Sequence, residues 1–364
     1  MKLCAVLLLA GVVAVADIDS LFAPLVDQKS PGMAVLVRKD GRTIFARGYG
    51  VRDLRTFDAI DHTTNFRLAS FTKQFTAMAI MLLVSDGKLR YDERLTEIFP
   101  DFPAYGRDIT IRHLLTHTSG LPDYEDLMDD RWTATRQIQD GEVLALLKAT
   151  SAPKFAAGTS WSYSNSGYVV LGLIAAKVSG TPFGQLLETR IFKPLGMTRT
   201  ILYERGKNKV VERAFGHSRK SGVWAETDQS STSATLGDGG IYSNIDDLAR
   251  WDEALEMHSL LKDESMKAAL TPVRLADGSQ PKWPVKAGED NLDPGKPVFY
   301  GFGWFLDPYE GRARMWHSGT TTGFRTIIQR FPAERLTVIV LSNRTDVDTG
   351  KLAEQVLLSI RAQR

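Results

Sequence analysis

Apolar and polar residues follow two different periods along the chain, and the change between them predicts where strands and helices lie. Two apolar-rich runs flank the dipeptide Asp40 and Gly41, which suits a two-residue hairpin and predicts the start of an antiparallel sheet. From Ser70 to about Val84 the apolar residues instead recur at helical spacing. Gly87 is a natural end for that helix.

The stretch from about residue 88 to 235 is mostly helical in pattern, and strand-like runs return after it. These runs are FYGFGWFL, FRTIIQRFP and LTVIVLSN, and a last helix is expected near LAEQVLLSIRA. Strands at both ends with helices between them predict an α/β (α+β) fold. Its antiparallel sheet, flanked by helices, is built from N- and C-terminal segments, and a mostly helical subdomain is inserted, with a cleft where the two parts meet.

We therefore expect one domain over residues 17–364. Its sheet part covers about 17–87 and 236–364, and its helical insertion covers about 88–235. Residues 274–298 are rich in Gly, Pro and charge and are expected to form a long surface loop.

Composition narrows the class of protein. Hydrophobic residues make up 43% of the 364 residues and charged residues 24%, which predicts a packed globular core. Lys and Arg number 45 against 43 Asp and Glu, so the charge balance gives no support for a nucleic-acid partner or a strongly electrostatic membrane partner. The expected partner is a small-molecule or peptide substrate, and the oligomeric state stays open.

The N-terminus, MKLCAVLLLAGVVAVADIDS, has the features of a secretory signal peptide over residues 1–16, with a cut before Asp17. Its apolar run is short for a membrane span, although an uncleaved membrane anchor is the alternative. A periplasmic or secreted protein without a stable membrane span is expected after cleavage. Cys4 is the one cysteine of the sequence, so the mature chain would have neither a free thiol nor a disulfide.

A lysine three residues after a serine can lie on the same helical face and serve as its base, but this pattern alone is common. The chain contains it at Ser70/Lys73, Ser85/Lys88, Ser151/Lys154, Ser259/Lys262 and Ser279/Lys282. Gly or Pro interrupts three of these pairs, and the pair at 259 lies in a polar setting. Ser70 differs because it opens a strongly apolar helix, whose dipole favours a developing negative charge.

The triplet YSN occurs twice, at Tyr163–Asn165 and at Tyr242–Asn244, each time before a helix. Either copy can be a helix start or part of a catalytic site, and the residues alone do not separate them. Asn244 has a sufficient structural role as the cap of the helix that begins IDDLARW, with two acids in its first turn.

An ordered set of motifs carries a family resemblance from about residue 30 to 345. FRLASFTKQFTAMAI, ITIRHLLTHTSGLPDY, WSYSNSGYVVLGLIAAKVSG, PLGMTRT, GGIYSNIDDLARW and MWHSGTTTGF together resemble the serine β-lactamase and penicillin-binding-protein superfamily. The most similar branch holds class C β-lactamases, D-Ala-D-Ala carboxypeptidases, D-aminopeptidases and related esterases.

The resemblance implies a role for each motif. Its SxxK, YxN and HxG elements fall on catalytic Ser70, Lys73 and Tyr163, and on substrate-binding Asn165, His317, Ser318, Gly319 and Thr320. The backbone N–H groups of Ser70 and Thr320 would form the oxyanion hole. Whether Lys73 or Tyr163 is the base stays open, because their titrations would be coupled. No metal or cofactor is implied.

Two positions differ from the residues that are usual in the motifs of the family. His317 stands where many β-lactamases have Lys, so a positive charge there depends on pH. A protonated His317 would hold a substrate carboxylate; the alternative is that it only hydrogen-bonds the Tyr163 hydroxyl or the Ser70 region. Ala157 replaces a common Pro and is expected to change only loop stiffness.

The expected function is that of a serine hydrolase that forms an acyl-enzyme on Ser70. Its substrates would be D-amino-acid peptides, β-lactams or small esters, among which the sequence does not choose. The alternative is a penicillin-binding sensor or scaffold that acylates without turnover. His113 and His117 are spaced as in a zinc-protease helix, but Leu114 replaces the required Glu, so both histidines are expected to be structural.

Overall fold

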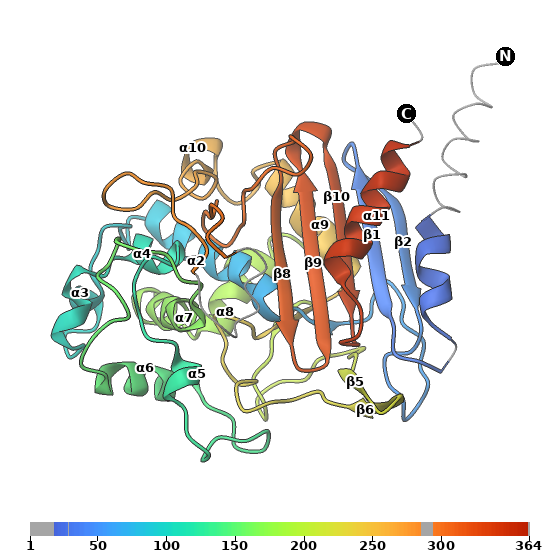
Figure 1. Cartoon of the computed structure of the whole chain (residues 1–364), viewed down its shortest axis with the longest axis horizontal. Coiled ribbons are helices and arrows are strands. Elements are labelled where there is room, and N and C mark those ends of the chain that lie inside the picture. Colours follow the sequence, from blue (N-terminus) through green and yellow to red (C-terminus); the bar gives the residue numbers. More distant parts are fainter. Residues whose placement is uncertain (1–17, 28, 285–293, 363–364) are drawn as a thin grey trace.

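A five-stranded antiparallel sheet joins the two ends of the chain in the computed structural model, which describes residues 18–27, 29–284 and 294–362 (Figure 1). The strand order is β2-β1-β10-β9-β8. The strands are β1 (Met33–Lys39), β2 (Arg42–Tyr49), β8 (Met315–Thr321), β9 (Phe324–Phe331) and β10 (Leu336–Ser342). The predicted α/β fold with a sheet built from N- and C-terminal segments is thus confirmed. The expected signal peptide, residues 1–16, lies outside the described residues.

The hairpin between β1 and β2 turns at the predicted dipeptide. Asp40 and Gly41 have φ angles of 50° and 76°, and two positive φ values in succession are what a tight two-residue hairpin requires. In the middle of the sheet every residue of β10 is buried, because helices cover both of its faces. That burial explains why LTVIVLSN is a continuous apolar run rather than an alternating one.

One face of the sheet is covered by the C-terminal helix α11 (Thr349–Arg361) and by residues 18–22. Figure 1 shows α11 lying along β9 and β10 on this face. Leu352 and Val356 of α11 share an apolar cluster with Phe22, Val35 and Val338. The opposite face of the sheet contributes to the main core, which extends into the helical part.

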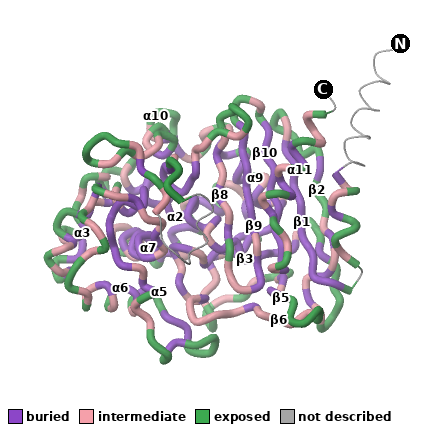
Figure 2. Tube along the Cα trace, in the orientation of Figure 1, coloured by how far each residue is buried: buried purple, intermediate pink, exposed green. Residues whose placement is uncertain are grey.

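The centre of that core is α2 (Lys73–Ser85), which follows the 3₁₀ turn η2 (Ala69–Thr72). Its first eleven residues are all buried, since η2 packs against β8 and α2 packs against α7 (Figure 2). Gly87 ends the helix with a φ of 72°, as predicted. α2 therefore connects the sheet to the helical part and is screened from water by both.

Most of the regular structure between residues 88 and 235 is helical, but the segment also contributes short strands and long connections. Its helices are α3 (Leu95–Ile98), η3 (Ala104–Asp108), α4 (Ile111–Leu115), α5 (Tyr124–Leu127), α6 (Asp140–Ala149), α7 (Asn165–Ser179), α8 (Phe183–Leu187) and η4 (Glu188–Phe192). Its strands are β4 (Ile201–Leu202), β5 (His217–Lys220) and β6 (Val223–Glu226). β4 joins β3 (Phe66–Arg67) and β7 (Ile241–Ser243) in a small second sheet, and β5 pairs with β6.

The remaining helices follow or flank the sheet. They are α9 (Ile245–Glu256), α10 (Asp263–Met266) and the 3₁₀ turns η1 (Ala23–Leu25) and η5 (Pro332–Glu334). In the described ranges, no single helix is both long enough and apolar enough to cross a bilayer; a pair bent by 77°, α7 with Phe183–Phe192, meets that test of length and composition.

The run FYGFGWFL does not form the strand expected from its pattern. Tyr300 and Phe305 instead face each other across a tight reversal, and Phe305 also bridges to Trp316 of β8. Gly303 has a φ of 76°, and a Cβ at this position would lie 2.9 Å from the carbonyl oxygen of Lys73. The segment turns because its glycines let the backbone approach the start of α2. The expected long loop at 274–298 is only partly covered, because residues 285–293 lie outside the described ranges.

The start of α9 allows a test of the second YSN triplet. Asn244 is fully buried, its side-chain oxygen accepts from the Asp247 N–H at 2.9 Å, and its amide donates to Asn65 at 3.0 Å. We expect Asn244→Ala to lower the free energy of unfolding by about 2 kcal/mol, because a cap and a buried hydrogen bond are lost together. Urea unfolding measures this loss. Unchanged stability with lost turnover would instead assign this triplet to catalysis.

Candidate active site

Ser70 lies on the turn η2, directly before the buried helix α2. The residue before it, Ala69, has a φ of 51°, a left-handed conformation that is strained for a residue with a side chain. The preceding carbonyl, that of Leu68, accepts a hydrogen bond from the Thr326 hydroxyl of β9 at 2.8 Å. The sheet therefore holds the turn that presents the half-buried Ser70 side chain.

Lys73 is fully buried, and its ammonium group makes three hydrogen bonds to oxygen atoms. Lys73 Nζ lies 3.0 Å from Ser70 Oγ, 2.8 Å from Asn165 Oδ1 and 3.0 Å from the Asp238 carbonyl oxygen. A lysine ammonium has three N–H donors, so each one has an acceptor. The two predicted residues Ser70 and Lys73 are thus in direct contact, as the SxxK spacing on a helical turn implies.

The first YSN triplet lies beside this pair. Lys73 Nζ is 4.9 Å from the centre of the Tyr163 ring, a distance at which a cation is attracted by an aromatic face. The cap of α7 is Ser164, whose hydroxyl accepts from the Gly167 N–H at 3.0 Å. Because Ser164 caps the helix, the Asn165 side chain is left to contact Lys73.

His117 fixes the segment that carries this triplet. Its Nδ1 accepts from the Ser164 N–H at 3.1 Å, and its ring lies 4.4 Å from the ring of Tyr163. His113 instead caps the start of α4, where its Nδ1 accepts a hydrogen bond from the Thr110 N–H at 3.2 Å. In the part of the chain that the structure describes, no three His, Cys, Asp or Glu side chains gather closely enough to hold a metal ion.

The second YSN triplet lies in the small sheet, in a different environment. Tyr242 is 1% exposed, and its hydroxyl accepts from the Arg213 guanidinium at 3.1 Å. Asn244 caps α9, as the sequence predicted. The two copies therefore differ in tertiary contacts: Asn165 bonds to Lys73, whereas Asn244 bonds to Asn65 and Asp247.

Strand β8 forms the edge of the main sheet and packs against η2. Its residues alternate, so His317 and Gly319 are buried while Ser318 is half-buried and Thr320 is exposed. A Cβ at Gly319 would lie 2.0 Å from the Leu68 carbonyl oxygen. Position 319 must be Gly for β8 to lie this close to the turn that carries Ser70.

His317 differs from the charged anchor considered above. Its side chain is 1% exposed, and burial lowers its pKa to about 3, with the nearby Lys73 ammonium as a further cause. Its Nδ1 lies 2.7 Å from the Ser318 carbonyl oxygen, which can only accept, so Nδ1 carries the proton. Nε2 then accepts from the Tyr300 hydroxyl at 3.2 Å. The imidazole is therefore neutral at neutral pH, and its hydrogen bonds go to neither Tyr163 nor Ser70.

Aromatic rings surround the Tyr163 side of the site. The Tyr163 ring is nearly parallel to that of Phe305, with centres 6.5 Å apart, and Phe305 stacks on Trp316 at 4.5 Å. Trp283, from the loop after α10, stacks on the same phenylalanine at 5.6 Å. Packing of this kind limits the orientations open to the Tyr163 ring.

Glu125 of α5 is a member of the site that the sequence pattern missed. Its Oε1 accepts from Asn165 Nδ2 at 3.3 Å, on the opposite end of the amide that contacts Lys73. Glu125 is accessible to solvent, yet enough protein surrounds it that partial burial raises its pKa, and the Asp123 carboxylate raises it further. In the sequence Glu125 is one of several acids after LPDY and resembles an ordinary first-turn acid of a helix.

A serine–lysine pair at the head of a buried helix, beside the edge of an antiparallel sheet, defines the class of serine hydrolases with the β-lactamase and transpeptidase fold. The model of the family described as Beta-lactamase matches residues 18–360, and the chain belongs to this family. This finding confirms the resemblance drawn from the motifs.

Individual relatives agree with the family. A penicillin-binding protein of Bacillus subtilis (strain 168) is 31% identical over 360 residues, covering 93% of this chain and 75% of that protein. A D-aminopeptidase of Gluconobacter oxydans (strain 621H) is 28% identical, with 86% of this chain and 56% of the relative covered, so the chain spans just over half of that protein.

Solved structures show the same fold. A penicillin-binding protein from Bacillus halodurans superposes with a TM-score of 0.75 at 26% identity, covering 96% of this chain and 98% of the other. The D-amino acid amidase from Ochrobactrum anthropi SV3 gives a TM-score of 0.79 at 24% identity and covers 96% and 99% of the two chains.

The buried neutral His317 predicts how stability depends on pH. An unfolded histidine binds a proton near pH 6.5, whereas native His317 does so only near pH 3, so the unfolded state holds more protons between these values. Stability should therefore fall as pH drops from about 6.5 towards 3, by up to about 1.4 kcal/mol per pH unit from this residue.

Urea unfolding across this pH range measures the slope. His317→Gln should make the slope less steep, because the variant has no group to titrate there, while buried His117, whose pKa is also lowered by burial, keeps its own contribution. Equal slopes for the wild type and His317→Gln would contradict the neutral buried imidazole.

Proposed function

We propose that the protein forms an acyl-enzyme on Ser70 and hydrolyses amide or ester bonds of D-amino-acid derivatives that have a free amino group. The observation that carries the proposal is the contact between Ser70 Oγ and the buried Lys73 Nζ at 3.0 Å. A serine hydroxyl needs a neighbouring group that accepts its proton, and a lysine held in hydrogen-bond reach supplies one when it is in its neutral amine form.

The chemical steps follow from this contact. Ser70 Oγ bonds to the substrate carbonyl carbon while its proton passes to whichever of Lys73 and Tyr163 is deprotonated. The same pair returns a proton to the leaving amine or alcohol when the scissile bond breaks. Water then attacks the ester on Ser70 and gives a proton to the deprotonated member of the pair. The pair returns a proton to Ser70 Oγ as its bond to the carbonyl carbon breaks, which releases the acid and regenerates the serine.

The edge strand β8 supplies the other half of the proposed site. An edge strand has unpaired backbone groups, so an extended substrate can align with Ser318–Thr320 by main-chain hydrogen bonds. In this alignment the N–H groups of Ser70 and Thr320 would face the carbonyl oxygen. Each oxyanion donor of this kind contributes about 3 kcal/mol in the transition state. Buried His317 and Gly319 hold the strand in place rather than touching substrate.

Two features favour a substrate with an ammonium group over one that needs a cationic anchor. The Glu125 carboxylate lies 3.3 Å from the Asn165 amide and is open to solvent, so it offers a counter-charge close to the nucleophile. A neutral His317, in contrast, offers no charge for a substrate carboxylate. A D-aminopeptidase among the relatives is in keeping with this choice.

The acyl-enzyme is tested by covalent labelling. A fluorescent penicillin or a fluorophosphonate should label the wild type, with the adduct on the peptide that contains FRLASFTK. Ser70→Ala should lose the label and about four orders of magnitude in turnover, as the loss of a catalytic nucleophile does in other serine hydrolases.

Ser85→Ala, at the next serine that precedes a lysine by three residues, is the matched control and should keep both label and turnover. An adduct elsewhere would refute Ser70 as the nucleophile. A single equivalent of product without further turnover would identify the sensor alternative instead.

The proposed role of Glu125 is tested with a pair of substrates. Glu125→Gln should lower kcat/KM for a D-aminoacyl p-nitroanilide by about tenfold to a hundredfold, because a charge-assisted hydrogen bond is lost. The N-acetylated form of the same anilide should be much less affected, since it has no ammonium group. Asp126→Asn, at the adjacent exposed acid, serves as the control. An equal loss for both substrates would mean that Glu125 acts only through Asn165.

A further inference from the structure

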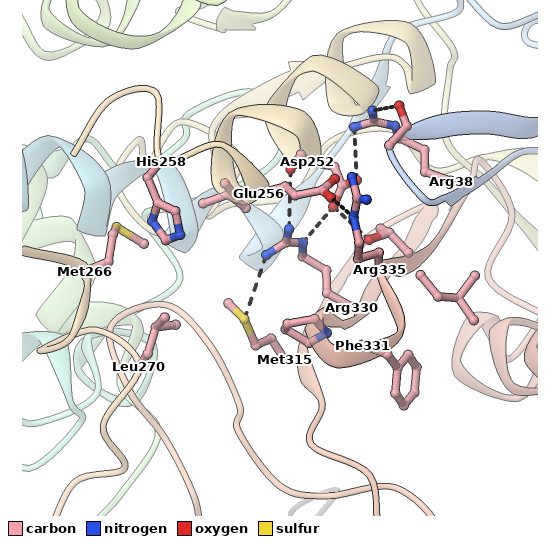
Figure 3. A pocket seen from close by; sticks show the side chains of 15 residues that line it. Arg38, Asp252, Glu256, His258, Met266, Leu270, Met315, Arg330, Phe331 and Arg335 are labelled. Atoms are coloured by element: carbon pink, nitrogen blue, oxygen red, sulfur yellow. Dashed lines mark hydrogen bonds and ion pairs between the residues drawn. The ribbon is translucent and has the colours of Figure 1, made fainter. Parts of the chain in front are cut away.

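A cavity lies at the end of the sheet away from the catalytic residues. It has a volume of about 200 Å3 and is lined by the ends of β1 and β9, the starts of β8 and β10, and the end of α9 with the segment after it (Figure 3). None of the residues assigned above to the candidate active site lines it.

The wall formed by the strands carries more buried positive than negative charge. Arg38 and Arg330 are 5% and 7% exposed, and both pair with one carboxylate, that of Asp252, at 3.0 and 2.6 Å. The other pair at this wall, Arg335 with Glu256, is neutral as a whole. Arg38 has a second carboxylate partner, the exposed Glu253, at 4.0 Å. Among the described residues Arg330 pairs with the Asp252 carboxylate alone and shares it with Arg38, so the charge of Arg330 is only partly balanced, and a buried charge without a full partner is costly.

Several guanidinium N–H groups at this wall lack a good acceptor. Arg38 Nε is buried without a hydrogen-bond partner. Arg330 uses Nε on the Asp252 carboxylate and one Nη on the Asp252 carbonyl, while its other Nη has the thioether sulfur of Met315 at 3.8 Å. Figure 3 shows the Arg330 guanidinium between Asp252 and Met315. A thioether is a weak acceptor, so a carboxylate oxygen would satisfy this donor better.

The remaining lining is largely apolar. Met266 and Leu270 lie across the cavity from Arg330 in Figure 3, and Leu255, Phe331 and Leu336 also line it. The polar residues His258 and Thr337 are part of the lining too. Leu270 is 37% exposed, which places it at the solvent-facing rim. Since a cavity of about 150 Å3 can hold benzene, this one has room for an aromatic ring and a carboxylate.

We propose that this cavity binds a small monocarboxylate that carries one apolar group of about the size of a phenyl ring. The carboxylate accepts from the Arg330 Nη that now has only the Met315 sulfur, and the apolar group lies against Met266 and Leu270. The proposal does not depend on the proposed hydrolytic function, because the two sites share no residue.

Ligand-observed ¹⁹F NMR with 4-fluorophenylacetate tests the proposal on the full chain. We expect saturable binding of one equivalent. Binding of 2-(4-fluorophenyl)ethanol, which has the ring but no charge, should be at least about tenfold weaker, as should competition by acetate, which has the charge but no ring.

Three variants assign the binding to this cavity. Leu270→Trp fills the rim and should weaken binding at least about tenfold, and Arg330→Gln should do the same by removing the charge. Val223→Trp, at a 69% exposed position on β6, is the matched control and should bind normally. Melting temperature and turnover of Leu270→Trp, close to those of the wild type, would show that it is folded.

Unchanged binding in Leu270→Trp would overturn the location of the site. Equal binding of the acid and the alcohol would overturn the role of the arginines. Absence of saturable binding to the wild type would overturn the proposal as a whole.

Discussion

Burying the ammonium group of Lys73 is the constraint on which the rest of the site depends. A charge out of reach of water needs an acceptor for each N–H, and here these come from three separate parts of the chain: η2, the start of α7 and the segment before β7. The three parts must therefore meet at one point. The absence of a side chain at Gly303 lets its segment approach the first turn of α2, and the absence of one at Gly319 lets β8 approach Leu68, next to Ala69 and its left-handed backbone.

Features set by neighbouring residues could be predicted from the sequence. The hairpin at Asp40 and Gly41, the helix after Ser70 and the cap at Asn244 depend on local backbone preferences and on spacing, which are visible in one stretch of chain. Local preferences and spacing were not enough to decide which of the two YSN triplets belongs to the active site. Both triplets precede a helix, and they differ because Ser164 caps the first helix and leaves the Asn165 side chain free to contact Lys73. The order of the family motifs predicts this difference, whereas local backbone preferences do not.

Features set by burial could not be predicted in this way. The protonation state of His317 depends on how completely its side chain is buried. The segment FYGFGWFL reverses direction because Gly303 packs against the backbone at the start of α2. Glu125 lies next to Asn165 only after α5 and α7 have packed. In each case the deciding neighbour is far away in the sequence, and a single sequence without an alignment carries no signal of it.

The pairing of β1 with β10 has a consequence for how the molecule is made. Met33 lies opposite Ser342, so the middle of the sheet cannot form until the chain has been synthesised at least as far as Ser342. Contacts between such distant residues slow folding, because a long loop must close before any of them is gained. Ser70 and Lys73 leave the ribosome early, but β8, which forms the wall beside them, is among the last strands to arrive. A nascent chain that stops short of β8 would have the serine and the lysine without a cleft around them.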